Sequence, residues 1–357
     1  MRTSHKLTRL FFALSALVVL AASAFAGPAP TNIGVSDQKA GSFLAFPYYN
    51  SRAGADTRLT ISNVGDRTVA VHMFFIGADC NQADQTVCLT ANASATFLAS
   101  EYDPENTGYL LAVATAPDST SFTSIAGPLG VPPAGPIQAG CPVQYNGLIG
   151  NAFVNDGNYV GNYGAEAFWL HSTPNGTAAN GVVCNTNDWT ATLTFNGNCG
   201  VGGYDMQPNQ FVAEIQSPND SVGQRIISAG LNGGLSASGA FTLNGAQQVG
   251  IGVAYNDGEK AGSFSSPFAG SCLRSFIINP TTPRVPGGLG SITGVNNNAL
   301  IPSGRTGTIK FNTAGSVGLI LTPRQGTNKW TGIRTLHKTS VLPTASLTIP
   351  IFQSPGC

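Results

Sequence analysis

The chain has 357 residues and a formal net charge of zero, because its 17 basic residues are balanced by 17 acidic ones. Charged side chains make up only 10% of the sequence and form no basic stripe, which argues against nucleic acid and anionic membrane surfaces as partners. Since 42% of the residues are hydrophobic, the chain can bury one large core or two ordinary ones.

Residues 1–26 have the features of a secretory signal peptide. Arg2, Lys6 and Arg9 form a positive start, residues 10–22 are apolar, and residues 24–26 have the small-x-small pattern of a signal peptidase site. The apolar run is too short to span a membrane, and no later segment is long and apolar enough to do so. We therefore expect cleavage after residue 26 and a secreted or cell-surface protein without a membrane span.

Residues 27–125 predict an N-terminal β-sandwich module. Residues 57–62 alternate polar and apolar side chains, as a half-buried strand does. Three further strands are predicted at 69–75, 94–100 and 108–114, each with apolar residues on a shared face. The segments are separated by turns or loops with Gly, Asn and Asp. Four strands within about sixty residues are typical of an immunoglobulin-like sandwich.

The rest of the chain predicts a connecting region and a second module. Residues 126–205 mix short strands with Asn/Gly turns and predict a loop-rich β connection. Residues 206–357 predict a C-terminal β-sandwich module, with strands at 247–255, 273–279, 304–311, 316–322 and 345–352. The predicted fold class is all-β, with two immunoglobulin-like sandwich modules and long Gly/Asn/Pro-rich loops. A single sandwich with a large insertion is the alternative.

Two segments carry a loose resemblance to known proteins. Residues 59–65, Leu-Thr-Ile-Ser-Asn-Val-Gly, resemble the entry of immunoglobulin-like domains on bacterial surface proteins. The later segments, including residues 349–352, resemble exported bacterial proteins of unassigned function. The resemblance covers most of the chain after the signal segment, contains no diagnostic motif and implies no activity.

All seven cysteines follow the predicted cleavage site, where an oxidising compartment favours disulfides. Zinc is the alternative, but the sequence has no Cys-x-x-Cys pair and no clustered histidines. Closeness in sequence predicts the pairs Cys80–Cys88 and Cys184–Cys199, and we further predict Cys272–Cys357. This pairing leaves Cys141 as a free thiol or as a link to another chain.

An aromatic cluster is the predicted ligand-binding feature. Tyr159, Tyr163, Phe168 and Trp169 lie within eleven residues and are separated by Gly and Asn. Aromatic rings stack on the C–H surfaces of sugars while amides bond to hydroxyls, so these four residues predict a glycan-stacking site. The alternative is that the rings pack in the core, where most aromatic side chains of a sandwich lie.

Acidic residues suggest two further sites. Asp103 and Glu105 alternate in an oxygen-rich turn, which predicts a structural calcium site. No other cofactor is predicted. Glu101 and Glu166, with the two residues just named, are candidates for the paired carboxylates of a glycoside hydrolase. The alternative is that these carboxylates are solvated loop charges or turn formers.

The sequence contains no complete catalytic motif, so the predicted function is not enzymatic. We expect an extracellular surface or matrix protein that acts through β-sandwich interaction modules, with self-association or a cell-surface glycan as its partner. The alternative is a secreted carbohydrate-binding protein, and a weaker alternative is a glycoside-acting hydrolase.

Overall fold

A computed structural model confirms the all-β fold class. It describes residues 34–118, 138–171, 182–185, 187–197, 202–217, 220, 223–244, 251–265, 272–278, 285–286, 294–295, 300–324 and 331–352. These residues form 27 strands and one short 3-10 turn, η1 (Ala99–Glu101). The predicted signal segment 1–26 lies outside the described residues. Within the described part of the chain, no helix is long and apolar enough to cross a membrane.

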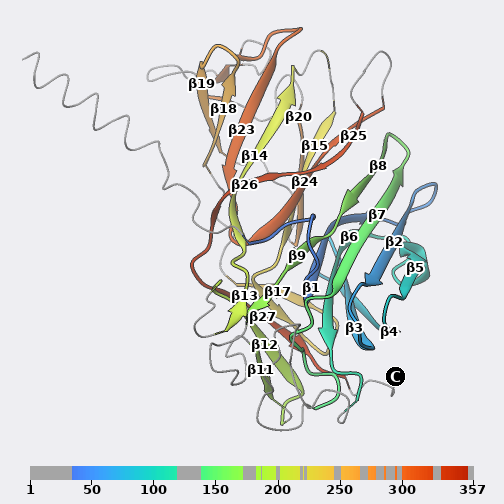
Figure 1. Cartoon of the computed structure of the whole chain (residues 1–357). Helices are drawn as coiled ribbons and strands as arrows, with labels where there is room; N and C mark the ends of the chain where they lie inside the picture. Colours follow the sequence, from blue (N-terminus) through green and yellow to red (C-terminus); the bar gives the residue numbers. More distant parts are fainter. Residues whose placement is uncertain are drawn as a thin grey trace, which may run out of the picture. The chain divides into compact units, whose positions relative to one another are not determined.

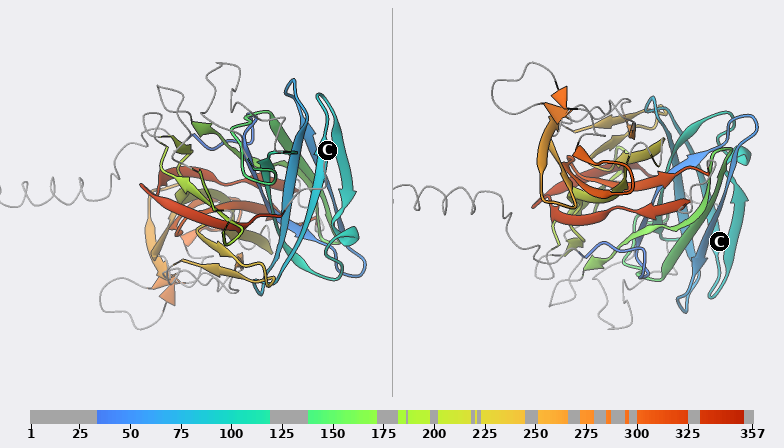
Figure 2. Two further views of the ribbon diagram at one scale, coloured as in Figure 1. Left: turned by 90° about the horizontal axis from the view of Figure 1, so that it is seen from below. Right: turned by 90° about the horizontal axis from the view of Figure 1, so that it is seen from above.

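Two sheets of the N-terminal half pack face to face (Figure 2). The first has the order β4 (Gln82–Leu89), β3 (Val69–Gly77), β6 (Thr107–Thr115), β1 (Phe43–Asn50) and β9 (Glu166–Phe168). The second has the order β5 (Ser94–Leu98), β2 (Asp56–Asn63), β7 (Leu148–Asp156) and β8 (Tyr159–Gly164). Together they form a β-sandwich.

The two sheets differ in what covers their outer faces. In β1, β3 and β6 nearly every side chain is buried, so both faces of this sheet are covered. In β2 and β7 buried side chains alternate with exposed or half-buried ones, so one face of the second sheet meets solvent. On that open face, Thr60 is hydrogen-bonded to Thr96 and Ser62 to Ser94 across neighbouring strands.

The C-terminal half adds two further sheets. One has the order β19 (Ala261–Ser265), β18 (Ile251–Asn256), β23 (Thr306–Asn312), β14 (Pro208–Gln216) and β26 (His337–Val341). The other has the order β20 (Leu273–Ile278), β15 (Gln224–Gly230), β24 (Ser316–Thr322) and β25 (Gly332–Thr335). All five strands predicted for this half are present, the fifth being β27 (Ala345–Pro350).

The sheet β20-β15-β24-β25 has a separate core on each face. Ile226 and Ile320 belong to the smaller core, with Phe211 and Phe311 of the neighbouring sheet. The next residues along the same strands, Ile227 among them, belong to the larger core with the N-terminal strands. Because successive side chains of a strand point to opposite faces, this sheet links the two cores.

Short strands complete the fold. A further sheet, with both parallel and antiparallel pairs, has the order β10 (Leu170–His171), β13 (Gly203–Tyr204), β12 (Thr190–Phe195), β27, β16 (Gly233–Leu235) and β17 (Phe241–Leu243). Strand β11 (Val182–Asn185) pairs with β12. A separate pair joins β21 (Val285–Pro286) to β22 (Gly294–Val295). Strand β12 pairs over its whole length with β27, so hydrogen bonds cross the predicted module boundary near residue 205 (Figure 1). The three-part division of the chain stays a prediction.

The predicted disulfide pairing is wrong. The structure has Cys80 bonded to Cys272, 192 residues away, and Cys141 bonded to Cys184. Cys141 is therefore not a free or intermolecular thiol, and the predicted pairs Cys80–Cys88, Cys184–Cys199 and Cys272–Cys357 do not form. Cys88 is itself disulfide-bonded. Cys199 and Cys357 lie outside the described residues.

The register of the β3–β4 hairpin explains the error. Gln82 pairs with Ile76 near the turn, whereas Cys88 pairs with Ala70 at the far end of the hairpin. Six residues of strand separate the two ends by about 20 Å, and a disulfide needs Cα atoms within about 7 Å. Cys272 instead lies beside the turn, where its N–H donates to the carbonyl of Ala78.

Candidate functional site

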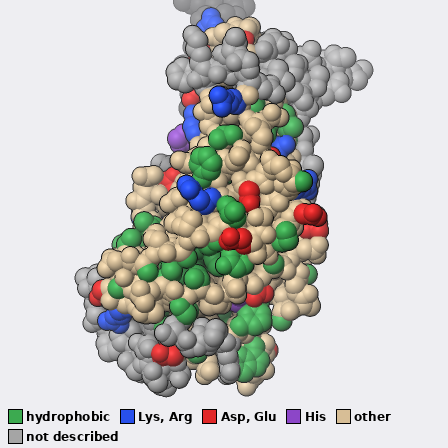
Figure 3. Space-filling model, turned by 90° about the vertical axis from the view of Figure 1, so that its right-hand side faces the viewer, with side chains coloured by type: hydrophobic (Ala, Val, Ile, Leu, Met, Phe, Trp, Pro, Cys, Tyr) green, Lys and Arg blue, Asp and Glu red, His purple; other side chains and the backbone are tan. Residues whose placement is uncertain are grey.

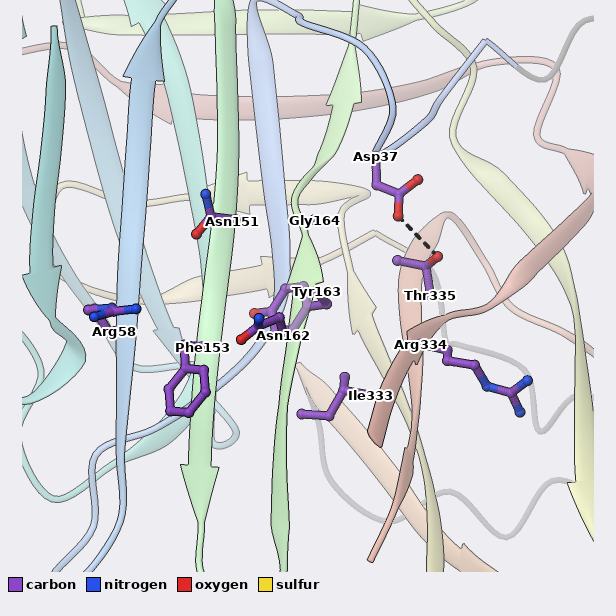
Figure 4. Close-up of a pocket in the computed structure, with 10 residues that line it drawn as sticks. All are labelled: Asp37, Arg58, Asn151, Phe153, Asn162, Tyr163, Gly164, Ile333, Arg334 and Thr335. Atoms are coloured by element: carbon purple, nitrogen blue, oxygen red, sulfur yellow. Dashed lines mark hydrogen bonds between the residues drawn. The ribbon is translucent and has the colours of Figure 1, made fainter. Parts of the chain in front are cut away.

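The open sheet face ends in a groove of about 490 Å³ between β8 and β25 (Figure 4). Strands β2, β7 and β8 form one side, and β25 with the segment before β1 forms the other. The lining residues are Asp37, Arg58, Asn151, Phe153, Asn162, Tyr163, Gly164, Ile333, Arg334 and Thr335. The groove therefore contains an exposed aromatic ring, two side-chain amides and two guanidinium groups.

The alternation of β7 places the aromatic ring. Phe153 and Asn151 point outward from β7, while Ala152 and Val154 are buried. Phe153 lies opposite Arg58 of β2 and opposite Asn162 of β8 in the strand register. The guanidinium carbon of Arg58 lies 5.7 Å from the ring centroid of Phe153, a cation–π contact. The ring remains 37% exposed and is available to a ligand.

Two glycines let the opposite side of the groove approach β8. A Cβ atom at Gly161 would lie 3.1 Å from the backbone nitrogen of Ile333, and one at Gly164 would lie 3.0 Å from the Cβ of Asp37. These distances are tighter than ordinary carbon contacts, so larger residues would push the two sides apart. Thr335 Oγ1 lies 3.4 Å from Asp37 Oδ2, and this contact joins the two segments of the far side.

The groove has little net charge. Arg58, Arg334 and Asp37 are its charged residues, which leaves one positive charge in excess. Arg334 lies 3.8 Å from the carboxylate of Glu214, outside the groove, and this exposed pair is weak. The face of the molecule in Figure 3 also shows mainly uncharged polar side chains and backbone, with single charges between apolar side chains. Such a surface favours a ligand rich in hydroxyl groups over a polyanion.

A second group of charged residues lies between β10 and the segment before β1, with Asp205 buried and Lys39 and His171 half-buried. The carboxylate of Asp205 accepts hydrogen bonds from Lys39 Nζ at 2.5 Å, from the Trp169 backbone N–H at 2.7 Å and from His171 Nε2 at 2.8 Å. Burial alone would raise the pKa of Asp205, but these donors outweigh it and hold the pKa below its ordinary value of 3.8.

We expect Asp205→Asn to lower the free energy of unfolding by about 1–3 kcal/mol near neutral pH, because three donors lose a charged acceptor. A carboxyl group whose pKa is lowered by folding stabilises the folded protein at pH values above its unfolded pKa of 3.8. This stabilisation is lost as the pH falls through the folded pKa. The difference between wild type and variant should therefore shrink in acid. Urea unfolding at several pH values measures it, and a difference that is constant with pH would contradict the assignment.

The predicted glycan-stacking residues do not form one exposed face. Tyr159, Tyr163 and Phe168 are buried, so the core-packing alternative holds for these three. The Tyr159 hydroxyl donates to the carbonyl of Gly223 at 2.6 Å, the Tyr163 hydroxyl donates to the carbonyl of Tyr48, and Phe168 packs against other aromatic rings. A sugar cannot stack on rings that are covered in this way.

Trp169 is exposed but is already engaged. Its Nε1–H donates to the carbonyl of Ala40 at 2.5 Å, and Lys39 Nζ lies 5.3 Å from the ring centroid. It belongs with Asp205 and not with the groove.

The predicted calcium ligands are part of a hydrogen-bond network. Asp103 accepts from the Tyr49 hydroxyl and from Asn106 Nδ2 at 3.1 Å, while Glu105 has the left-handed backbone of a turn, with φ of 61°. Among the described residues, no three His, Cys, Asp or Glu side chains are grouped so as to hold a metal ion. The calcium site at Asp103 and Glu105 stays a prediction.

The two remaining carboxylates also have structural contacts. Glu101 Oε2 accepts from the Leu98 backbone N–H at 3.1 Å at the start of η1. Glu166 on β9 is completely buried, and Lys338 Nζ of β26 lies 2.6 Å from its Oε1. Burial raises the pKa of Glu166, and the charge of Lys338 lowers it only in part.

Of the groove residues, the sequence singled out Tyr163, which is buried, and missed the others. A signal for them exists in residues 148–156, where Ile149, Asn151, Phe153 and Asn155 alternate with apolar or small residues. That alternation identifies an outward-facing ring. The opposite side of the groove has no local signal, because Ile333 is nearly two hundred residues away in the sequence.

Comparison with known proteins adds no identification. No family model matches the chain, and no curated protein matches it. The crystal structure of Thermotoga maritima 1070 is 15% identical over 36% of this chain and 95% of that chain, with a TM-score of 0.23. The apo form of the Pleurotus ostreatus lectin is 11% identical over 92% of this chain and 83% of that chain, with a TM-score of 0.14. At these scores neither similarity bears on fold or function.

Proposed function

We propose that this protein is a secreted, non-enzymatic surface or matrix protein that acts by binding through immunoglobulin-like β-sandwich modules. The disulfides Cys80–Cys272 and Cys141–Cys184 support a site of action in an oxidising compartment, where such bonds form and persist. Cys141 is bonded to Cys184 and therefore cannot link this chain covalently to another one. Self-association would therefore be non-covalent at this position.

The open sheet face with its groove is the observation that carries the proposal. Thr60–Thr96 and Ser62–Ser94 form an uncharged polar ladder beside the exposed ring of Phe153. Asn151 and Asn162 are exposed on the same side and offer amide donors and acceptors. A flat ring next to amides and hydroxyls suits a saccharide, so a carbohydrate is the ligand class that we assign to the groove.

The contacts of the acidic residues support binding over hydrolysis. A glycoside hydrolase needs two carboxyl groups facing one substrate bond. Glu101 is bonded to a turn, Asp103 to a tyrosine, and Glu166 to a lysine within the core. Each carboxylate thus has a structural role where it stands.

Replacing the aromatic ring tests the groove. We expect Phe153→Ala to reduce retention on a panel of insoluble polysaccharides by roughly five- to tenfold, because an aromatic contact contributes about 0.5–1.5 kcal/mol beyond its buried area. Ile149→Ala is the matched control, since Ile149 lies on the same strand and face, is 39% exposed and does not line the groove. Its retention should equal that of the wild type.

Four outcomes would contradict the proposal. Equal retention of Phe153→Ala and wild type would remove the groove as the binding site, and a loss only in Trp169→Ala would move the site to the Asp205 region. A protein that binds no polysaccharide and stays monomeric at all concentrations in native mass measurements would contradict the surface or matrix function itself. Turnover of a chromogenic glycoside would contradict its non-enzymatic character.

A further inference from the structure

A second pocket, of about 560 Å³, lies where the N-terminal sandwich meets β15 and β20. Its sides come from the turn between β1 and β2, the turn between β7 and β8, and two strands of the C-terminal half. The volume falls within the range of about 300–1,000 Å³ that small-molecule sites occupy, and such sites favour junctions between structural units. None of the groove residues described above lines it.

Arg225 on β15 is the central residue of this pocket. Its guanidinium carbon lies 5.1 Å from the ring centroid of Tyr159, so the planar group is held by the aromatic ring. Its Nε atom is buried and has no hydrogen-bond partner among the described residues. Within the same part of the chain no carboxylate forms an ion pair with it. The rest of the guanidinium lies within hydrogen-bond reach of the Tyr48 and Tyr159 hydroxyls, which hold it at the pocket.

The other charges leave the pocket positive. Arg52 is exposed at the rim, where its backbone N–H donates to Asn50 Oδ1 at 3.0 Å and its side chain adds a second positive charge. Asp156 is the acidic residue of the lining, and its Oδ2 accepts the hydroxyl of Tyr48 at 2.6 Å. Burial, followed by the charge of Asp156, raises the pKa of Tyr48, so this hydroxyl stays protonated and keeps donating to the carboxylate.

We propose that this pocket binds a small organic carboxylate, with the Arg225 guanidinium as its principal partner. A guanidinium fork matches the two oxygens of a carboxylate, and its two terminal nitrogens can form the two parallel bonds. Ser275 and Asn158 also line the pocket and present groups that can bond to hydroxyls. An acidic monosaccharide fits these features in size, charge and polarity. The assignment is independent of the groove and of the proposed function.

Calorimetry of the full protein with glucuronate, glucose and inorganic sulfate tests this assignment. We expect glucuronate to bind, and glucose, which lacks the carboxylate, to bind at least about tenfold more weakly. Arg225→Lys keeps the charge but removes the fork and Nε, so it should weaken glucuronate binding by about tenfold or more. Arg67→Gln, an exposed arginine that lines neither the groove nor this pocket, should leave binding unchanged, and each variant's fold is checked by thermal unfolding.

Arg52, the exposed residue at the rim, provides a second variant in case Arg225→Lys does not fold. Arg52→Gln should weaken glucuronate binding and reduce its dependence on salt, because a positive charge at the rim is lost. Equal affinity for glucose and glucuronate, or unchanged affinity in both pocket variants, would overturn the proposal. Sulfate binding as tight as glucuronate binding would also overturn it, by showing a simple oxyanion site.

Discussion

Lys338→Met is expected to lower the free energy of unfolding by about 3–5 kcal/mol near neutral pH. Glu166 is completely buried, Lys338 is its ion-pair partner, and Oε2 of Glu166 has no hydrogen-bond partner among the described residues. Removing the lysine leaves a buried carboxylate without a counter-charge, while methionine preserves most of the apolar stem. Urea unfolding of the two proteins measures the difference.

The pH dependence identifies the cause of this loss. The pKa of Glu166 is raised above its ordinary value of 4.5. Between pH 4.5 and the folded pKa, the folded protein therefore binds more protons than the unfolded chain, and its stability falls as the pH rises. Lys338 opposes that rise, and its removal moves the folded pKa higher still. The destabilisation in Lys338→Met should therefore be largest near neutral pH and should shrink as the pH falls toward 4.5.

Two controls separate the ion pair from general damage to the sheet. Lys310 lies on β23 and forms no ion pair within the described residues, so Lys310→Met should change stability by no more than about 0.5 kcal/mol. Replacing both partners, as Glu166→Gln with Lys338→Met, should recover much of the loss because no buried charge remains. A double variant as unstable as the single one would contradict the argument.

Removing the disulfide between Cys80 and Cys272 is expected to cost about 4–5 kcal/mol, the upper part of the usual range. The bond joins residues 192 positions apart, so it excludes many extended conformations of the unfolded chain. It also ties the end of β3 to the start of β20, which belong to different halves of the chain. The double variant Cys80→Ala/Cys272→Ala, compared with wild type in guanidinium unfolding, measures this contribution.

The second disulfide supplies the matched comparison. Cys141 and Cys184 are 43 residues apart, so the same loop-closure argument gives a cost about 1 kcal/mol smaller for the pair Cys141→Ala/Cys184→Ala. We expect Cys80→Ala/Cys272→Ala to lower the free energy of unfolding more than Cys141→Ala/Cys184→Ala does. A larger loss from the shorter loop would show that strain or packing, and not chain entropy, governs the contribution of these bonds.

The strands with an alternating pattern were predictable from the sequence. The segment 57–62 corresponds to β2, and the five segments of the C-terminal half correspond to β18, β20, β23, β24 and β27. Strand β1 was not predicted, and all eight of its residues are buried. Strands β3 and β24 are also buried throughout but were predicted. A strand covered on both faces has no polar side to mark its period, so short apolar runs of this kind are ambiguous.

The candidate sites show the same division. Phe153 could be found from the alternation in β7, whereas the partners that make a groove around it come from β2, β8 and β25. In the second pocket, Arg225 and Tyr159 are in contact although more than sixty residues separate them. The aromatic cluster at Tyr159 to Trp169 was predicted as a glycan-stacking site, but three of its four rings are buried in the core.

The sequence by itself determined the all-β class, the low surface charge and many of the strands, because these follow from composition and from the period of apolar residues along the chain. Only the tertiary structure decided the disulfide partners, the burial of Tyr163 and Phe168, and the residues that meet in each pocket. The physical reason is that strand pairing and sheet packing join residues distant in sequence. Local pattern sets which face of a strand is apolar, but not which sheet that face meets.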